Sequence, residues 1–296
     1  MNNSIHNPPA LPRLRHAPSA LSRVARPFWH LASPLWHLAS LDAPTVAVVW
    51  SLAFARVAGV RLPLWVPALL ALGTWTVYVA DRLLDARAAF AAGNTSALRQ
   101  RHFFHWRHRR IFVPIAAACA AAAAAIIFTL MPSVSREHNS VLAAAALVYF
   151  SGVHLPRRPR WLAPIFSKEL LVGVLFTAGC ALPTLTRLHA GSANLRALLV
   201  AIAFFAALAW LNCHAISRWE SGRTAGPAAS FLACAGLALV CISIFVSVPI
   251  ATLIAAGSLS ALLLTALDRR RNRVSPLTLR AAADLVLLTP LVLLLT

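Results

Sequence analysis

Two aspartates, Asp81 and Asp85, stand four residues apart at the end of a long apolar segment of the chain. In an α-helix this spacing is about one turn, so both carboxylates should lie on one face of the helix. Two like charges in such a place repel each other and lose hydration, which favours a cation, or a ligand bridged by a cation, between them. Since the chain has only 8 acidic residues against 27 basic ones, this pair is the first candidate for a cation-dependent site.

Further ionisable residues interrupt apolar segments near their ends. They are Lys168, Glu169, His214, Arg218, Glu220, Asp268 and Asp284. Charged and polar groups within a membrane are costly, so they usually face the interior of a helix bundle or a water-filled cavity. Lys168 is the only lysine in the chain, and it opens an apolar segment. These residues are candidates for a charged site shared with Asp81 and Asp85.

The acidic residues other than Glu169 also have a structural interpretation, because arginines stand near them along the chain. The pairs to expect are Asp81 and Asp85 with Arg82 and Arg87, Glu220 with Arg218 or Arg223, Asp268 with Arg269 and Arg270, and Asp284 with Arg280. For Asp268 this would mean a solvated helix end. Arg82 should point away from the helix face that carries Asp81 and Asp85, which weakens the pairing interpretation for these two. Lys168 can equally be a marker of the cytoplasmic side.

The N-terminal part contains a tandem heptad, PFWHLAS followed by PLWHLAS, over residues 27–40. Trp29 and Trp36 repeat seven residues apart, as do His30 and His37, so each pair falls close to one helix face. Tryptophan beside a membrane span prefers the headgroup region, which predicts a short amphipathic stretch on the membrane surface. A histidine metal site is the less favoured alternative, since further ligands at zinc-like spacing are missing. Residues 1–26, rich in proline and arginine, are predicted to be disordered.

The longest predicted loop between apolar segments, residues 86–109, carries the motif RQRHFFHWRHRR, with a histidine at every third position. One interpretation is an interfacial basic helix with an aromatic face. The other is a lid whose arginines bind an anionic headgroup or a diphosphate. The loops on the opposite side are brief and nearly uncharged, so any chemistry of charged groups belongs to the side of this loop.

The elements that must position these residues are apolar helices. Hydrophobic residues make up 59% of the 296 residues and charged residues only 12%, whereas a soluble domain has about 25% charged residues. Nine apolar segments can cross a bilayer, namely residues 43–58, 63–84, 110–131, 139–155, 168–186, 195–216, 226–244, 249–267 and 276–295. Between the seventh and the eighth, Pro249 is the only sharp break. The predicted fold is all-α, a polytopic membrane bundle over residues 41–296 after a disordered or interfacial cytoplasmic segment, residues 1–40.

The basic residues are distributed unequally between alternate loops. With the N-terminus in the cytoplasm, arginine-rich loops such as 154–161 and 268–273 fall on the cytoplasmic side. This bias predicts a cytoplasmic N-terminus and, after nine spans, a C-terminus on the opposite side. The net charge of +19 thus reflects topology and attraction to anionic membrane lipids, and binding of nucleic acid is not expected. We expect an integral protein of a bacterial inner membrane without a cleavable signal peptide.

Nine spans, a cytoplasmic N-terminus and a DxxxD motif at the cytoplasmic end of the second span resemble the UbiA-type intramembrane prenyltransferases. The first motif of that family reads NDxxDxxxD, and Asp81 and Asp85 match its last two acids, while its leading Asn-Asp is missing here. The second motif, a DxxxD-like cluster at the end of span six, corresponds to WLNCHAISRWE, where Asn212 and Glu220 are the plausible oxygen ligands. This second match is the weaker of the two.

The resemblance implies a helical bundle around a central cavity that is open to the membrane. It implies transfer of an isoprenoid from a prenyl diphosphate to a lipophilic acceptor, such as an aromatic compound, with Mg²⁺ gripping the diphosphate. The implied metal ligands are Asp81, Asp85 and Glu220, and the implied catalytic residues are Lys168, Asp81 and Asp85. The implied substrate-binding residues are Tyr78, Arg82, Asn212, His214 and Arg218. Because the second motif departs from the family pattern, a catalytically degenerate member that binds or transports an isoprenoid or another amphiphile is the alternative. An ion-coupled transporter is a third hypothesis.

Overall fold

The computed structural model describes residues 35–96, 98–154, 168–188, 193–221, 227–245 and 247–295. Helices form nearly all of these residues, and no strand occurs among them, so the all-α prediction is confirmed for this part of the chain. The predictions for residues 1–26, for Trp29 and His30, and for Arg223 fall outside the described residues.

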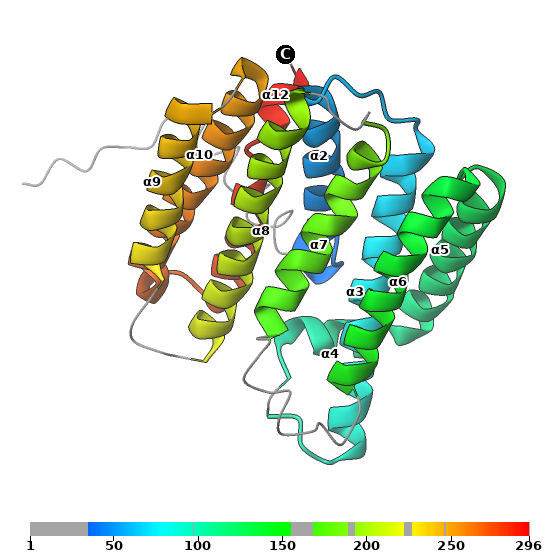
Figure 1. The fold of residues 1–296 in the computed structure, drawn as a ribbon. Helices are drawn as coiled ribbons and strands as arrows, with labels where there is room; N and C mark the ends of the chain where they lie inside the picture. Colours follow the sequence, from blue (N-terminus) through cyan, green and yellow to red (C-terminus); the bar gives the residue numbers. More distant parts are fainter. Residues whose placement is uncertain are drawn as a thin grey trace, which may run out of the picture.

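Long helices run side by side through the molecule, and the short helix α4 (Gln100–Arg107) lies across one end of them, which we call the α4 end (Figure 1). The long helices are α2 (Asp42–Val57), α3 (Trp65–Ala91), α5 (Arg109–Thr129), α6 (Ser133–His154), α7 (Lys168–Leu185), α8 (Ala193–Glu220), α9 (Ala228–Phe245) and α10 (Val248–Arg270). The C-terminal part consists of η2 (Arg271–Arg273), α11 (Pro276–Leu285), η3 (Val286–Leu288) and α12 (Leu291–Leu295). Helical structure therefore occurs in each of the nine predicted segments.

Four of the described helices are long and apolar enough to cross a membrane. They cover Arg109–Thr129, Lys168–Leu185, Leu195–Glu220 and Val248–Arg273. In α5 the apolar side chains are mostly exposed, as Ile111, Val113 and Phe128 illustrate. A helix that is apolar all round and yet exposed needs an apolar solvent, so the chain is built for a membrane, and the number of nine spans stays a prediction.

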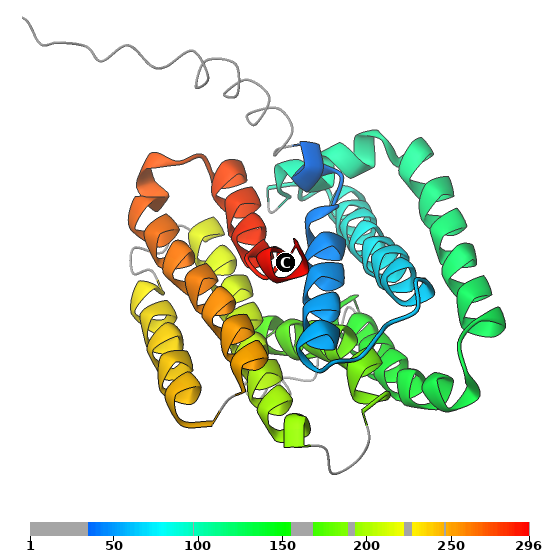
Figure 2. The ribbon, with the colours of Figure 1, turned by 90° about the horizontal axis from the view of Figure 1, so that it is seen from above.

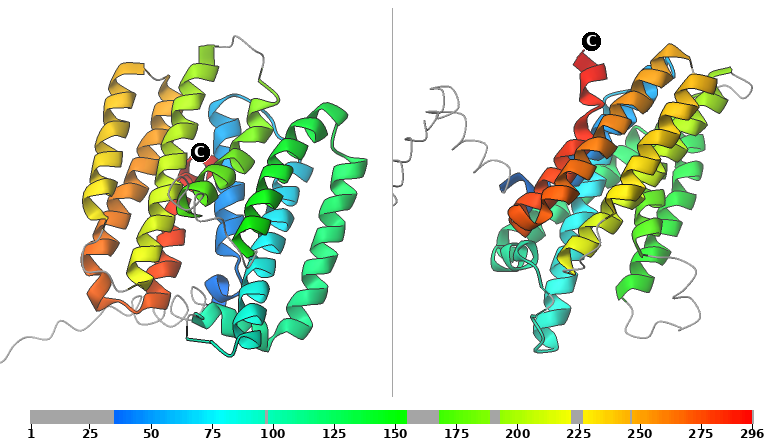
Figure 3. Two further views of the ribbon diagram at one scale, coloured as in Figure 1. Left: turned by 60° about the horizontal axis from the view of Figure 1, so that its bottom comes forward. Right: turned by 90° about the vertical axis from the view of Figure 1, so that its left-hand side faces the viewer.

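The core lies where α2 packs among later helices. Trp50 stacks on Phe205 of α8 with ring centroids 3.8 Å apart, and Phe54 meets the same ring edge-on. Seen from above, α12 lies beside α2 inside the surrounding helices (Figure 2). The α9–α10 pair packs side by side at the edge of the bundle (Figure 3). This arrangement brings the first and the last segments of the chain together.

The last predicted span, residues 276–295, is not one continuous helix. It divides into α11, η3 and α12, because Pro290 has no N–H to donate to the carbonyl four residues earlier. Tertiary partners take up carbonyls at the break: Trp50 Nε1 donates to Leu287 O at 2.9 Å, and Ser260 Oγ donates to Val286 O at 2.7 Å. The expected break near Pro249 is confirmed, since α9 ends at Phe245 and α10 begins at Val248.

Candidate functional site

At the α4 end, the inward-facing charge of α3 is an arginine. Arg82 is 3% exposed, its Nε donates to Ser40 Oγ at 2.7 Å, and its guanidinium lies 5.4 Å from the ring centre of Tyr78. Asp81 and Asp85, on the neighbouring face, are half-buried. The structure thus brings Tyr78 and Arg82 together, while the aspartates lie closer to the surface. The substrate-binding roles of Tyr78 and Arg82 stay predictions.

Ser40 is the junction between Arg82 and α4. It is fully buried, and its φ of 60° places a non-glycine residue in the left-handed region, a conformation that needs support from its surroundings. That support comes from both sides of the hydroxyl, which accepts from Arg82 Nε and lies 3.3 Å from His105 Nε2. In addition, Trp75 Nε1 donates to the carbonyl of Ala39 at 2.9 Å.

The helix α4 turns its histidines inward. His105 Nδ1 lies 2.8 Å from Arg101 O; since a carbonyl only accepts, Nδ1 carries the proton and Nε2 accepts from Ser40. Burial lowers the pKa of His105 to about 4 and that of His102 to about 3, the latter helped by the charge of Arg101. Both imidazoles are therefore neutral at pH 7. A short helix is present in this loop, as the first interpretation predicts, and its buried histidines pack it on the bundle. Its position at the membrane interface and a role as a lid stay predictions.

Glu220, at the end of α8, ties three helices together. Its Oε1 accepts from Arg101 NH1 of α4 at 2.8 Å and from Arg280 NH1 of α11 at 2.7 Å. Arg99 NH2 also donates to the Glu220 carbonyl oxygen at 2.9 Å. We expected local pairs, of Glu220 with Arg218 or Arg223 and of Arg280 with Asp284. Arg280 instead binds Glu220, because the folded chain offers it a carboxylate on a helix far away in sequence.

Arginine charge gathers around this carboxylate. Burial, reinforced by the positive charges of Arg280 and Arg82, lowers the pKa of Arg101 to about 10. The Nε atoms of Arg101 and Arg280 are buried and have no hydrogen-bond partner within the described residues. A buried N–H without an acceptor is costly, so this arginine cluster (Arg82, Arg101 and Arg280) has donor capacity that an anionic ligand can satisfy.

The residues expected to hold Mg²⁺ do not fit that ion in this arrangement. Glu220 already accepts from two arginines, and a cation beside two guanidinium groups is repelled. Asp85 Oδ2 lies 3.7 Å from His102 Nε2 of α4, with its side chain 37% exposed. Mg²⁺ demands a near-octahedral set of carboxylate, phosphate and water oxygens, whereas this set offers two half-buried aspartates and a glutamate that already binds two arginines.

Three other predicted site residues belong to α7 and α8. Lys168 is exposed at the first residue of α7, and none of the contacts among the described residues joins it to the cluster. His214 is half-buried in α8, with its ring centre 6.2 Å from that of Trp210. Arg218 is half-buried in the last turn of the same helix. Their predicted roles stay predictions.

A second buried cluster lies where the N-terminal segment meets α11. His37 Nδ1 is hydrogen-bonded to Asp42 Oδ2 and lies 3.7 Å from Asp284 Oδ2. Asn212 of α8, which is 4% exposed, directs its Nδ2 to Asp284 Oδ1 at 3.2 Å. Burial lowers the pKa of His37, although the hydrogen bond to Asp42 opposes this effect.

This second cluster was only partly visible in the sequence. His37 was singled out by its heptad and Asp284 by its depth in an apolar segment, whereas Asp42 was missed. Its signal is an acidic residue at the entry of the first apolar segment. The pairing itself is not readable from the sequence, since 242 positions separate Asp42 from Asp284 and only the packing of α11 on α2 brings them together.

Asp268 corrects another expectation. A solvated helix end was predicted, but Asp268 is 2% exposed. Its carboxylate accepts from Trp219 Nε1 at 2.7 Å and from the backbone N–H of Ala228 at 3.1 Å. Ala228 is the first residue of α9, where backbone N–H groups have no partner within the helix. Asp268 therefore caps a neighbouring helix, which is a structural role.

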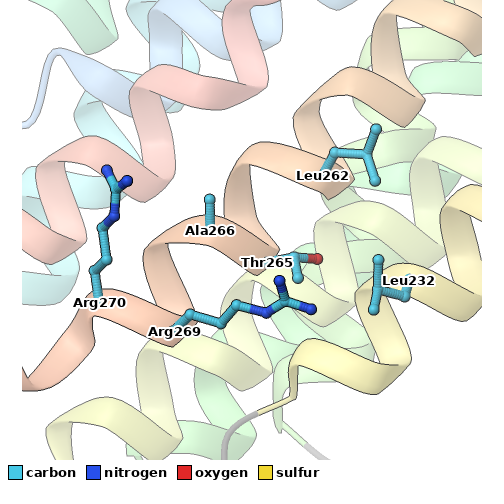
Figure 4. Close-up of a pocket in the computed structure, with 6 residues that line it drawn as sticks. All are labelled: Leu232, Leu262, Thr265, Ala266, Arg269 and Arg270. Carbon is cyan, nitrogen blue, oxygen red and sulfur yellow. The ribbon is translucent and has the colours of Figure 1, made fainter.

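A pocket of about 280 Å³ lies between α9 and α10, away from both clusters (Figure 4). Its lining residues are Leu232, Leu262, Thr265, Ala266, Arg269 and Arg270. None of the predicted site residues lines it, and it opens at the edge of the bundle rather than at its centre. The central cavity implied by the resemblance to UbiA-type enzymes therefore stays a prediction.

Comparison with known proteins adds no family to this description. No family model matches the chain, and no curated protein or solved structure shows significant similarity to it. The fold and the site thus define a class only: an all-α membrane protein whose helices bury a network of arginines, carboxylates and histidines at one end.

Proposed function

We propose that the protein binds the diphosphate headgroup of an isoprenoid at the α4 end and transfers the isoprenoid to a lipophilic acceptor. The observation that carries this proposal is the arginine cluster: Arg101 of α4 and Arg280 of α11 bind the single carboxylate of Glu220, and the charge of the buried Arg82 of α3 acts on Arg101. Arginine matches phosphate oxygens with planar, two-pronged hydrogen bonding, and a buried site strengthens that interaction. The proposal includes nine spans, a cytoplasmic α4 end and a C-terminus on the opposite side.

The substrate chemistry fits a site at a bundle end. A prenyl diphosphate has a long apolar tail, which can lie among membrane helices, and a polyanionic head, which needs cationic partners near the surface. Arg101 and Arg280 each have a buried Nε–H without a partner within the described residues. An incoming diphosphate would satisfy these donors and share NH1 of both arginines with Glu220. The excess of positive charge would then be balanced by the ligand.

Transfer would use the same arginines as electrostatic stabilisers. When the C–O bond to the diphosphate breaks, its electron pair goes to the diphosphate, and guanidinium groups stabilise that negative charge. The isoprenoid carbon is left electron-poor, and Tyr78, beside Arg82 in the interior, offers an aromatic face to it. The acceptor forms the new bond to that carbon and releases a proton. No step is assigned to Mg²⁺, since the predicted ligands do not fit it.

The second candidate function is binding or transport of the same kind of amphiphile without chemistry. Its supporting observation is the state of Glu220, which is bound to Arg101 and Arg280 and so does not act as the metal ligand of a catalytic pair. Both functions require the arginine cluster. They differ only in whether diphosphate is released.

The test uses purified protein in lipid nanodiscs with labelled farnesyl or geranylgeranyl diphosphate. Arg101→Gln should weaken binding about tenfold or more, because a charge-assisted hydrogen bond contributes about 1.5–3 kcal/mol. Arg107→Gln is the matched control, since Arg107 is an exposed arginine of the same helix, and its binding should equal that of the wild type. Equal binding by all three proteins contradicts the proposal. Binding without release of diphosphate, in the presence of a lipid extract as acceptor source, selects the second candidate.

A further inference from the structure

The cluster at His37 contains two carboxylates and an imidazole that face one another. The ligand atoms of His37, Asp42 and Asp284 all lie within 4.8 Å of one another. His37 and Asp42 are almost completely buried, with 1% and 4% exposed, and Asp284 is 18% exposed at its side chain. Two buried carboxylates at this separation repel each other unless a proton or a cation lies between them.

We propose that His37, Asp42 and Asp284 bind a divalent transition-metal ion, with Asn212 as a fourth ligand. This inference goes beyond the proposed function, because it concerns other residues and requires no substrate. The ion would replace the proton that His37 and Asp42 share. Their contact, closer than two ligands of one ion, would lengthen as the ion enters.

The spacing of the ligands suits a small ion. Nitrogen and oxygen ligands of Zn²⁺ lie about 2.0–2.2 Å from the ion, so two ligands of one ion are separated by at most about 4.4 Å. The distance of 3.7 Å from His37 Nδ1 to Asp284 Oδ2 already falls within this limit. Shifts of a few tenths of an ångström would bring the whole group into range.

Unpartnered polar atoms at the cluster point to a missing ligand. Asn212 Oδ1 and His37 Nε2 are both buried and have no hydrogen-bond partner within the described residues. The Asn212 amide already reaches Asp284 through its nitrogen. Amide nitrogen and oxygen are assigned from the hydrogen-bond network alone, so the two can be exchanged by turning the side-chain amide. In the turned orientation Asn212 Oδ1 would lie beside Asp284 and could serve as an oxygen ligand of a cation.

The donor set selects the kind of ion. Imidazole suits Zn²⁺, Cu²⁺, Fe²⁺ and Ni²⁺, and carboxylates suit Mn²⁺, whereas Mg²⁺ prefers oxygen ligands only. A site with one imidazole and two carboxylates therefore favours Zn²⁺ or Mn²⁺ over Mg²⁺. The nearby positive groups Arg82 and Arg280 oppose any cation, but each is turned to another partner, to Ser40 and Glu220 respectively. Two carboxylates balance the charge of one divalent ion.

Bound metal would hold the two ends of the chain together. His37 precedes α2, Asp42 begins α2, Asp284 belongs to α11, and Asn212 to α8. Anything that binds the folded state alone stabilises it. We therefore expect the ion to raise the unfolding temperature in the absence of any isoprenoid.

The experiment measures metal content in chelator-stripped, detergent-purified protein that is dialysed against Mn²⁺, Zn²⁺ or Mg²⁺ and analysed by mass spectrometry of the metal. Wild-type protein should retain one Mn²⁺ or Zn²⁺ per chain and hold Mg²⁺ at least tenfold more weakly. Asp284→Asn and Asp42→Asn should each weaken binding at least a hundredfold and abolish the metal-dependent rise in unfolding temperature. Asp268→Asn is the matched control, a buried carboxylate at the same end that should bind metal as the wild type does.

A second readout is spectroscopic and starts from the wild-type protein. Mn²⁺ bound to wild-type protein should give a pulsed electron paramagnetic resonance signal with coupling to a directly bound imidazole nitrogen, and His37→Gln should remove that coupling. The proposal is overturned if wild-type protein retains no stoichiometric Mn²⁺ or Zn²⁺. It is also overturned if the nitrogen coupling is absent, or if metal binding is the same in Asp284→Asn and His37→Gln as in the wild type. Each result is independent of whether a prenyl diphosphate binds.

Discussion

The buried polar groups at the two ends of the bundle have different kinds of partners. At the α4 end, charged side chains are buried and bind partners from other helices, as Glu220 does with Arg101 and Arg280. Around α12, the buried polar contacts are neutral hydrogen bonds to backbone carbonyls, such as that from Trp50 to Leu287. A neutral contact of this kind holds a broken helix in place. Removing one partner of a buried ion pair is costly, and the buried Nε atoms of Arg101 and Arg280 without a partner within the described residues are the reason why we propose an anionic ligand at the α4 end.

The largest expected effect comes from removing the shared carboxylate. Glu220→Gln would leave Arg101 and Arg280 without the carboxylate that both bind. This should lower the free energy of unfolding by about 3 kcal/mol, the lower end of the range expected when one partner of a buried ion pair is removed. Thermal unfolding in detergent would measure this loss. Glu137→Gln, at an exposed glutamate, should change stability by less than about 0.5 kcal/mol. A loss as small in Glu220→Gln would show that the charges at the α4 end are paired independently of Glu220.

Acid should weaken the α4 end selectively. The folded state holds the pKa of His105 at about 4, below the unfolded value of about 6.5, so the unfolded state takes up the proton first as pH falls. The stabilisation is therefore complete above pH 6.5 and is lost progressively between pH 6.5 and 4, by about 1–2 kcal/mol at pH 5. Unfolding measured across this range should show a shallower decline for His105→Gln than for the wild type. Parallel curves would contradict this role.

The packing of α7 on α8 can be tested separately from the buried charges, because the contact involves no charged group. A Cβ atom on Gly173 of α7 would lie 2.8 Å from the backbone nitrogen of Trp210 in α8, whereas one on Gly179 of the same helix would have no neighbour within 4 Å. Gly173→Ala should thus cost about 1–3 kcal/mol through overpacking. Gly179→Ala should be neutral or stabilising by up to about 1 kcal/mol. Similar unfolding temperatures for the two variants would mean that α7 and α8 are less closely packed.

A smaller effect than at Glu220 is expected at the neutral contact near α12. Trp50→Phe keeps an aromatic ring to stack on Phe205 but removes the donor to the Leu287 carbonyl. Loss of one neutral hydrogen bond should cost about 1–2 kcal/mol, including the acceptor left without a partner. Trp36→Phe, at a tryptophan that is 42% exposed, serves as the control. If Trp50→Phe destabilised the protein more than Glu220→Gln, the contrast between the two ends would fail.

The positions of the helices could be predicted from the sequence, whereas the partners of the buried charged side chains could not. Apolar segments of sufficient length predicted where the helices lie, because periodicity and length are local properties. Pro249 indicated the break before α10. The last span was predicted as one apolar segment, 276–295, and its interruption depends on Pro290 inside it.

For the site, local rules misassigned the partners. Pairing four residues apart predicted Arg280 with Asp284, whereas the fold brings Arg280 to Glu220, 60 positions away. Arg82 was correctly expected on a different face from Asp81 and Asp85, but only the packing of α3 shows that the arginine's face is the inner one. Which face of a helix is buried depends on its neighbours, and an apolar helix in a membrane has too weak a polar side to indicate them.

The central claim is that the arginine cluster recognises an anionic headgroup, and a comparison of two ligands with the same tail tests it most directly. Binding of farnesyl diphosphate and of farnesol would be measured by equilibrium competition in nanodiscs, for wild type and for Arg280→Gln. We expect the diphosphate to bind at least tenfold more tightly than the alcohol to the wild type, and the difference to fall sharply in the variant. Equal affinity of the wild type for both ligands would contradict the account.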